Sequence, residues 1–211
     1  MTITIDELVV ADPPEVWTHL GFEVDDDGRC RVGSVAIRLA GRDAGRGIVG
    51  WSLRGVPADL SDLDGIPTTS SAHPVRPTAE HENEVTTIDH VVLLSPNLPR
   101  TIGTLTALGV LPRRERDGIM GGAPIRQVFF RLGEVILEVV GSPDARSDEP
   151  SGLWGITYTV ADIDAIAARF GDLTTPVKDA VQPGRRITTL RHRELGTSVR
   201  TAMISQPILG A

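Results

Sequence analysis

The sequence predicts an α+β fold in which repeated βαβββ units form curved mixed sheets and paired units enclose a cleft. Two local repeats indicate this architecture. Strand-like segments begin with Thr-Ile-Asp at both 4–6 and 87–89, and each is followed by a helical segment and further strands. Similar hairpins, Arg-Val-Gly-Ser-Val and Arg-Leu-Gly-Glu-Val, occupy 31–35 and 131–135. One unit is too small to bury both faces of its sheet, so we expect two units to stack and leave a concave surface where they meet.

Residues 1–66 are predicted to form a degenerate N-terminal half, in which one βαβββ unit precedes a truncated second unit. The elements expected here are a strand at 3–10, a short helix ending near Gly21, strands at 22–24, 29–32, 35–39 and 48–56, and a helical turn at 60–63. Asp12 is expected to cap the helix, because two prolines follow it. Residues 67–85 have no hydrophobic period and contain three prolines, which predicts a linker.

Residues 86–206 are predicted to form a domain of two βαβββ units, which we call the second and third units because the complete N-terminal unit is the first. The second unit has a strand that includes Thr87, a helix with Ile102, Leu105 and Leu108 at helical spacing, and strands at 111–115, 125–131 and 135–140. The third unit has a strand at 153–160, a helix at 162–170, and strands at 177–181, 186–191 and 199–204. Gly118, Gly121 and Gly122 open no helix and predict a mobile loop near the cleft.

Composition restricts the classes of partner. A net charge of -7 provides no basic field for phosphates, so nucleic-acid binding is disfavoured and a small-molecule ligand is favoured. Cys30 is the only cysteine, which excludes an intrachain disulfide. No segment has the pattern of a leader or a membrane span, so we expect no membrane association and a cytoplasmic location. The incomplete N-terminal half leaves a sheet edge that either a homodimer or the other half would cover.

Two polar residues stand in apolar strands and are the leading candidates for catalysis. Glu138 lies in the run Val135-Ile-Leu-Glu-Val-Val140, and strand alternation places it on the same face as Ile136 and Val140. A carboxylate on a mostly apolar face is desolvated, which suits a general base. His90 lies in the run Ile-Asp-His-Val-Val-Leu-Leu, where it is either a hydrogen-bonded core residue or a functional one. Alternation predicts that Asp89 points to the opposite face and has a structural role.

Three further residues are candidates for substrate binding. Arg186 follows a Pro-Gly turn and opens a strand, so its guanidinium either reaches over the cleft to a carboxylate or phosphate, or lies on a solvated hairpin. Trp154 and Tyr158 lie in the first strand of the third unit. They either line the pocket or belong to the core.

The chain resembles the vicinal oxygen chelate superfamily, which includes glyoxalase I, extradiol dioxygenases, methylmalonyl-CoA epimerase and bleomycin-resistance proteins. The motifs that carry the resemblance lie within 86–206 and read IDHVV, FFRLGEVILEVV, LWGITYTVADIDA and AVQPGRRI. The chain looks most like actinobacterial glyoxalase-like proteins in which a degenerate half precedes a regular domain. This resemblance implies a glyoxalase-like fold of paired βαβββ units.

The resemblance also implies one divalent metal ion, Ni, Zn, Fe or Mn, held by a His in the first strand and a Glu in the last strand of each unit. Carried over by position, the ligands are His90 and Glu138. Gln127 is a candidate third ligand, because its strand pairs with the one that carries Glu138. The third unit departs from the pattern, with Gly155 at the His position and Thr201 or Ala202 at the Glu position. The first unit departs as well, with Glu7 and Arg38 at the two positions.

Two classes of function follow from this resemblance. One is a metal-dependent lyase, isomerase or dioxygenase that acts on an oxygenated metabolite between the second and third units. If no metal binds, His90 and Glu138 are an acid and base pair, or they hydrogen-bond a ligand. The alternative is a non-catalytic protein that sequesters a drug or metabolite, as bleomycin-resistance proteins do.

Overall fold

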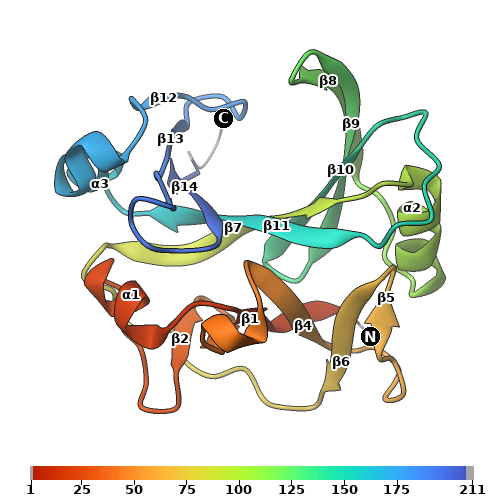
Figure 1. Ribbon diagram of the computed structural model, residues 1–211, viewed down its shortest axis with the longest axis horizontal. Helices are drawn as coiled ribbons and strands as arrows, with labels where there is room; N and C mark the ends of the chain where they lie inside the picture. Colours follow the sequence, from red (N-terminus) through yellow and green to blue (C-terminus); the bar gives the residue numbers. More distant parts are fainter. Residues whose placement is uncertain (1, 208–211) are drawn as a thin grey trace.

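The structure is a computed structural model that describes residues 2–207. Two mixed sheets lie one above the other, and the first seventy residues form the lower layer in the view of Figure 1. No helix among residues 2–207 combines the length and hydrophobicity that crossing a membrane requires.

The upper sheet has eight strands and consists of two βαβββ units. Its strands are β7 (Val85–Leu94), β8 (Arg114–Met120), β9 (Ala123–Leu132), β10 (Val135–Gly141), β11 (Gly152–Val160), β12 (Lys178–Asp179), β13 (Arg186–Thr189) and β14 (Arg200–Ser205), in the order β12-β13-β14-β11-β7-β10-β9-β8. The helices are α2 (Leu98–Ala107) and α3 (Ile163–Phe170), with a 3-10 helix at Gly171–Leu173. In each unit the first strand lies parallel to the last, and the two first strands meet antiparallel at the centre. The predicted fold is confirmed.

The lower sheet has six strands and consists of two shortened units. Its strands are β1 (Thr4–Val10), β2 (Arg29–Val32), β3 (Val35–Leu39), β4 (Ile48–Arg54), β5 (Asp62–Leu63) and β6 (Ile66–Ser71), with α1 (Pro14–His19) and a 3-10 helix at Arg42–Ala44. Their order is β2-β3-β1-β4-β6-β5. Again the first strand of each unit lies parallel to its last, so the lower sheet repeats the upper one with the outer strands missing.

Several expected elements differ in the structure. Residues 22–24 are not a strand, because Phe22 turns inward and packs on Trp17, with the two ring centroids 5.0 Å apart. The helical turn expected at 60–63 is replaced by the short strand β5. Residues 67–71, expected to begin the linker, belong to β6, where buried Thr68 accepts a hydrogen bond from the indole of Trp51. Polar residues thus fill a strand that hydrophobic periodicity alone does not detect.

Two further expectations are corrected. The predicted loop around Gly118 is instead the β8–β9 hairpin, which turns at Gly121 and Gly122 with positive φ at both. Asp12 does not cap α1, whose N-cap residue is Pro13 without a side-chain hydrogen bond.

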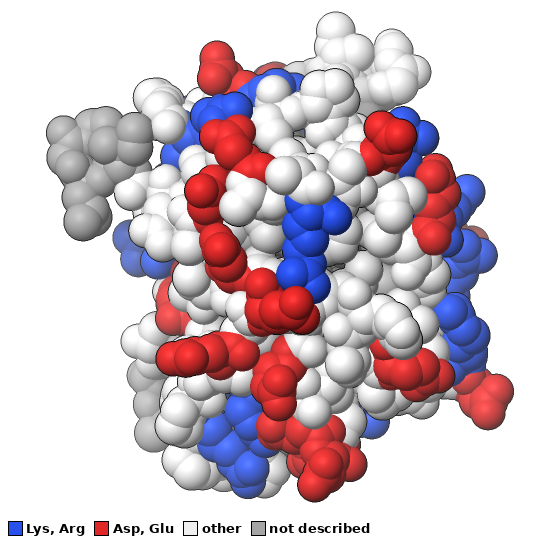
Figure 2. Space-filling model, turned by 90° about the vertical axis from the view of Figure 1, so that its left-hand side faces the viewer, with Lys and Arg blue, Asp and Glu red and all other residues white. Residues whose placement is uncertain are grey.

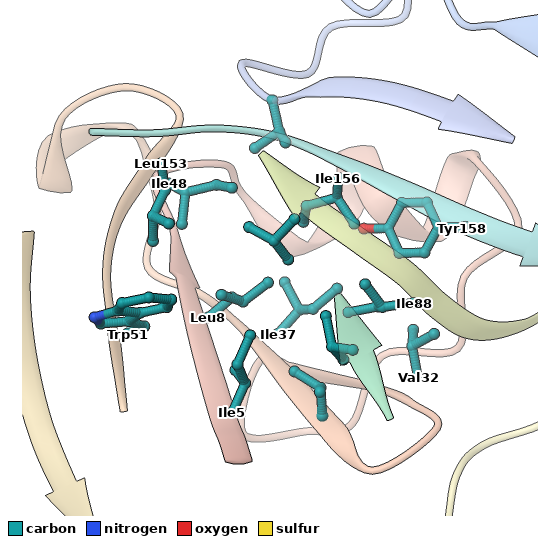
Figure 3. Close-up of a cluster of buried hydrophobic side chains, with 14 of the residues drawn as sticks. Ile5, Leu8, Val32, Ile37, Ile48, Trp51, Ile88, Leu153, Ile156 and Tyr158 are labelled. Atoms are coloured by element: carbon teal, nitrogen blue, oxygen red, sulfur yellow. The ribbon is translucent and has the colours of Figure 1, made fainter. Parts of the chain in front are cut away.

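The core lies between the two sheets. Figure 3 shows Ile5, Leu8 and Ile37 of the lower sheet among side chains of the upper sheet. Those side chains include Ile88 and Ile156, and all five are almost completely buried. Because each sheet covers one face of the other, the second face of the eight-stranded sheet is left for a site.

The two hairpins that repeat in sequence also meet in space. Gly33 and Gly133 occupy their turns with φ values of 59° and 69°, a region that glycine adopts without strain. The carboxylate of Glu134 accepts a hydrogen bond of 2.6 Å from the backbone N–H of Ser34. The repeated hairpins therefore join the two halves of the chain.

The first strand of every unit carries an extra residue at the same place. These β-bulges are Asp6 in β1, Val49 in β4, Asp89 in β7 and Trp154 in β11, and they are distinct from a further register shift at Thr86 near the start of β7. A bulge breaks the alternation of faces locally. In β7 it lies between Ile88 and Val91, which are both buried in the core, so the two intervening side chains are both directed away from the core.

Asp12 ties the N-terminal half to the end of the chain. Its carboxylate is fully buried and accepts hydrogen bonds from the indole of Trp17 at 3.2 Å and from the backbone N–H of Ser198 at 2.9 Å. We predict that Asp12→Ala lowers the free energy of unfolding by about 2–3 kcal/mol, since two buried donors lose their acceptor. Urea denaturation measures this change. Asp59→Ala, at an exposed position, is the control, and an equal small effect of both variants would contradict the assignment.

Candidate functional site

A cleft of about 590 Å³ lies on the face of the eight-stranded sheet that is turned away from the core. The β8–β9 hairpin rises on one side of the sheet and the β12–β13 segment on the other (Figure 1). His90, Gln127 and Glu138 line the cleft together with apolar side chains such as Phe129 and Ile136. The structure therefore brings together the three residues that the sequence nominated for catalysis or metal binding.

The bulge in β7 places Asp89 beside His90, which corrects the expectation that Asp89 points to the other face. Asp89 Oδ2 lies 2.8 Å from His90 Nδ1, and Oδ1 accepts a hydrogen bond from Arg185. Burial alone would raise the pKa of Asp89, but the hydrogen bonds from His90 and Arg185 outweigh it and hold the pKa below its usual value. An ionised carboxylate only accepts hydrogen bonds, so Nδ1 of His90 carries a proton.

The other ring nitrogen of His90 faces Glu138. Nε2 lies 3.6 Å from Glu138 Oε2, while Glu138 Oε1 accepts a hydrogen bond from the amide of Gln127. The oxygen of that amide accepts a 2.8 Å hydrogen bond from Arg116 Nε. With Nδ1 protonated, a neutral His90 presents a lone pair at Nε2 to a carboxylate oxygen. Two acceptors then face each other and can share one proton.

Arg185, and not Arg186, is the arginine that enters the site. The side chain of Arg185 is 7 % exposed and donates to Asp89, to Gln182 Oε1 at 2.9 Å and to the carbonyl oxygen of Ser205 at 2.8 Å. Its second terminal nitrogen has no hydrogen-bond partner among residues 2–207. The expectation for Arg186 is corrected, because its guanidinium forms a surface ion pair with Asp164 at 2.6 Å.

The two aromatic candidates lie away from the cleft lining. Tyr158 is fully buried in the core between the sheets, where its ring packs 5.3 Å from that of Phe22, and burial raises its pKa well above the ordinary value. Its predicted contact with substrate is therefore wrong. Trp154 occupies the bulge in β11 and is 39 % exposed. The guanidinium carbon Cζ of Arg200 lies over its ring, 4.7 Å from the ring centroid. Both belong to an apolar strand, where periodicity does not tell a pocket wall from a core.

The described residues supply only part of a metal site. Strand registers place Gly155 and Ala202 where the preceding unit has His90 and Glu138. A Cβ atom at Gly155 would lie 2.9 Å from the carbonyl oxygen of Arg200, so this position has no room for a ligand side chain. No group of three or more His, Cys, Asp or Glu residues within 2–207 is arranged to hold a metal. Catalytic zinc sites usually have three protein ligands, and this donor set does not fit one.

Asp89 and Arg185 are the site residues that the sequence reasoning missed. The sequence held a signal for Asp89. In a regular strand that buries one face, apolar core residues recur at every second position, whereas Ile88 and Val91 are three positions apart. The choice between Arg185 and Arg186 depends on the direction of one side chain after a turn. No local pattern of the sequence reports that direction.

No protein-family model matches the sequence, and no curated protein is significantly similar to it. Solved structures do match. A triple mutant of 4-hydroxymandelate synthase from Streptomyces coelicolor aligns with a TM-score of 0.67 and 15% identity, over 100% of this chain and 94% of that one. Homoprotocatechuate 2,3-dioxygenase from Brevibacterium fuscum, in complex with 3,4-dihydroxyphenylacetate, aligns with a TM-score of 0.60 and 14% identity. The alignment covers 99% of this chain and 81% of that one.

A third match is a fusion of a xylose isomerase-like TIM barrel with 4-hydroxyphenylpyruvate dioxygenase. It has a TM-score of 0.61 and 13% identity, over 100% of this chain and 50% of that one. At such identities the likeness concerns the fold alone. The fold is that of the vicinal oxygen chelate superfamily.

The buried Asp89–Arg185 pair gives a prediction for stability. Asp89→Asn removes one charge of this pair and should lower the free energy of unfolding at neutral pH by roughly 3–5 kcal/mol. Because the pKa of Asp89 is lower in the folded chain than in the unfolded one, its contribution is complete above about pH 4 and is lost as the pH falls further. Urea titrations from pH 3 to 7 should therefore show the difference between wild type and variant shrinking in acid.

The matched control is Asp117→Asn, which breaks an exposed ion pair with Arg126. We expect this variant to change the free energy of unfolding much less than Asp89→Asn does, because solvent screens an exposed ion pair. A difference between wild type and Asp89→Asn that stays constant over the whole pH range would contradict the account of the buried pair.

Proposed function

We propose that this protein is an enzyme that moves a proton on a small oxygenated molecule held in the cleft, as an isomerase or a lyase does. His90 and Glu138 are its acid and base pair. The observation that carries the proposal is the opposition of Nε2 and Oε2 at 3.6 Å, with Nδ1 of the imidazole hydrogen-bonded to Asp89 on its other side. Such an arrangement fixes the ring and leaves one site for an exchangeable proton.

The neighbours of the pair support this role. The carboxylate of Glu138 is almost completely buried, and the amide of Gln127 donates to one of its oxygens, which leaves Oε2 for a proton. A substrate lying over the pair can lose a proton to one member and regain a proton from the other at a neighbouring atom. This proton movement is the chemistry that isomerases and many lyases share.

The donor set separates this proposal from a metal-dependent dioxygenase. A divalent metal would supply Lewis-acid or redox chemistry, but His90 and Glu138 are only two ligands. The side-chain oxygen of Gln127, the expected third ligand, is turned to Arg116 instead. No step of the proposed reaction therefore passes through a metal ion.

The test is hydrogen exchange at carbon. We expect the protein, incubated in D2O with a panel of 2-oxo acids and α-hydroxy ketones, to catalyse exchange of the C–H bond beside the carbonyl in at least one of them, measured by proton NMR. Glu138→Gln and His90→Gln should each slow this exchange by about 100-fold or more, the usual contribution of a general acid or base. The reaction should persist in the presence of a chelator.

Two matched controls are Glu115→Gln, on the exposed part of β8, and His73→Gln, whose side chain is 85% exposed. Both should exchange at the wild-type rate. Exchange that disappears with chelator and returns with Ni, Zn, Fe or Mn would establish the metal-dependent alternative. A ligand that binds in the cleft without any exchange would instead support the sequestering protein.

A further inference from the structure

Five cationic side chains line the cleft, although the chain as a whole is acidic. They are Arg113, Arg114, Arg116, Arg131 and Lys178. Among residues 2–207, only two acidic residues, Glu138 and Asp179, share the lining. On the face of the molecule shown in Figure 2, by contrast, acidic side chains extend from top to bottom. The cleft is therefore positive in a protein whose net charge is -7.

These five cations have no counterion in the described part of the chain. None has a carboxylate oxygen within 4.0 Å among residues 2–207. Arg126, on the same strand as Arg131, provides the contrast, because it is paired with Asp117 at 2.7 Å. Cations that converge on a concave surface without counterions raise the local concentration of anions there.

The same cleft also has an apolar part. Phe129, Ile136 and Ile204 contribute to its lining, and Phe129 lies opposite Arg114 in the β8–β9 pair. Strand pairing also sets Ile136 opposite Arg131. Apolar and cationic side chains thus alternate across the β8–β10 wall, while Lys178 stands on the other wall. The volume of about 590 Å³ is in the range of small-molecule sites.

We infer that the cleft takes an organic anion with an apolar body and a carboxylate or phosphate group. The apolar body would lie on Phe129 and Ile136, and the anionic group would meet the unpaired cations. This inference rests on the proposed function, since it names the class of molecule whose proton His90 and Glu138 would move. A fixed anionic group would also orient the substrate over that pair.

The test uses three probes that share one aromatic body: 2-naphthoate, 2-naphthyl phosphate and the uncharged 2-naphthylmethanol. Calorimetric titration of the full chain should give at least one anion a dissociation constant about tenfold or more below that of the alcohol. The two anions tell a carboxylate site from a phosphate site. The preference should fall sharply at high salt, because exposed charges are then screened.

The double variant Arg131→Gln/Lys178→Gln should lose most of the preference for the anion and keep its affinity for the alcohol. Arg126→Gln, on the same strand but paired outside the cleft, should bind all three probes like the wild type. Equal affinities for anion and alcohol in the wild type would overturn the inference. So would an unchanged anion preference in the double variant, or the failure of all three probes to bind.

One variant separates this inference from the proposed function. His90→Gln should retain the preference for the anion, because it leaves the five cations in place. An anion preference without any C–H exchange would remove the proposed function and leave the inference standing. C–H exchange that occurs only on uncharged molecules would overturn the inference and leave the proposed function standing.

Discussion

The chemistry of the cleft depends on one extra residue in the central strand of the eight-stranded sheet. The bulge at Asp89 lets Ile88 and Val91 both remain in the core, while Asp89 and His90 leave the same side of the strand. Without it, alternation would send one of these polar side chains into the core, where an unpaired charge is costly. Because of the bulge, the carboxylate of Asp89 lies beside the ring of His90. Its contact with Nδ1 leaves Nε2 as the ring nitrogen that faces Glu138 in the cleft.

The same bulge occurs in the first, second and third units and in the shortened unit that begins with β4, so these units share a backbone geometry while their side chains differ. In the first unit the positions that correspond to His90 and Glu138 hold Glu7 and Arg38, which form an ion pair at 2.9 Å. In the third unit, Gly155 takes the place of His90, and close backbone approach leaves no space for a side chain. Of these three units, only the second therefore places an imidazole opposite a carboxylate. The repeated fold positions the site, and the residues of one unit give it its chemistry.

Much of the fold was predictable, because the repeats of Thr-Ile-Asp and of the glycine hairpins identify the units directly. That His90 and Glu138 line one cleft was predictable as well, since a polar residue in an apolar strand requires an explanation. Sequence reasoning failed where the outcome depends on tertiary context. Polar β6 is a strand only because β4 and β5 pair with it, and the choice of Arg185 over Arg186 depends on the buried carboxylate of Asp89. Tyr158 belongs to a core that forms only when the two sheets meet.

The most direct test of this account is the protonation of His90, read by long-range proton–nitrogen NMR correlation on protein labelled with nitrogen-15. Asp89 is ionised and only accepts hydrogen bonds, so the account predicts a proton on Nδ1 at neutral pH. Nε2 would then be the nitrogen that gains and loses a proton. A neutral ring that carries its proton on Nε2 instead would contradict the account, because Nδ1 would face the Asp89 carboxylate without a donor and Nε2 could no longer accept a proton from a substrate.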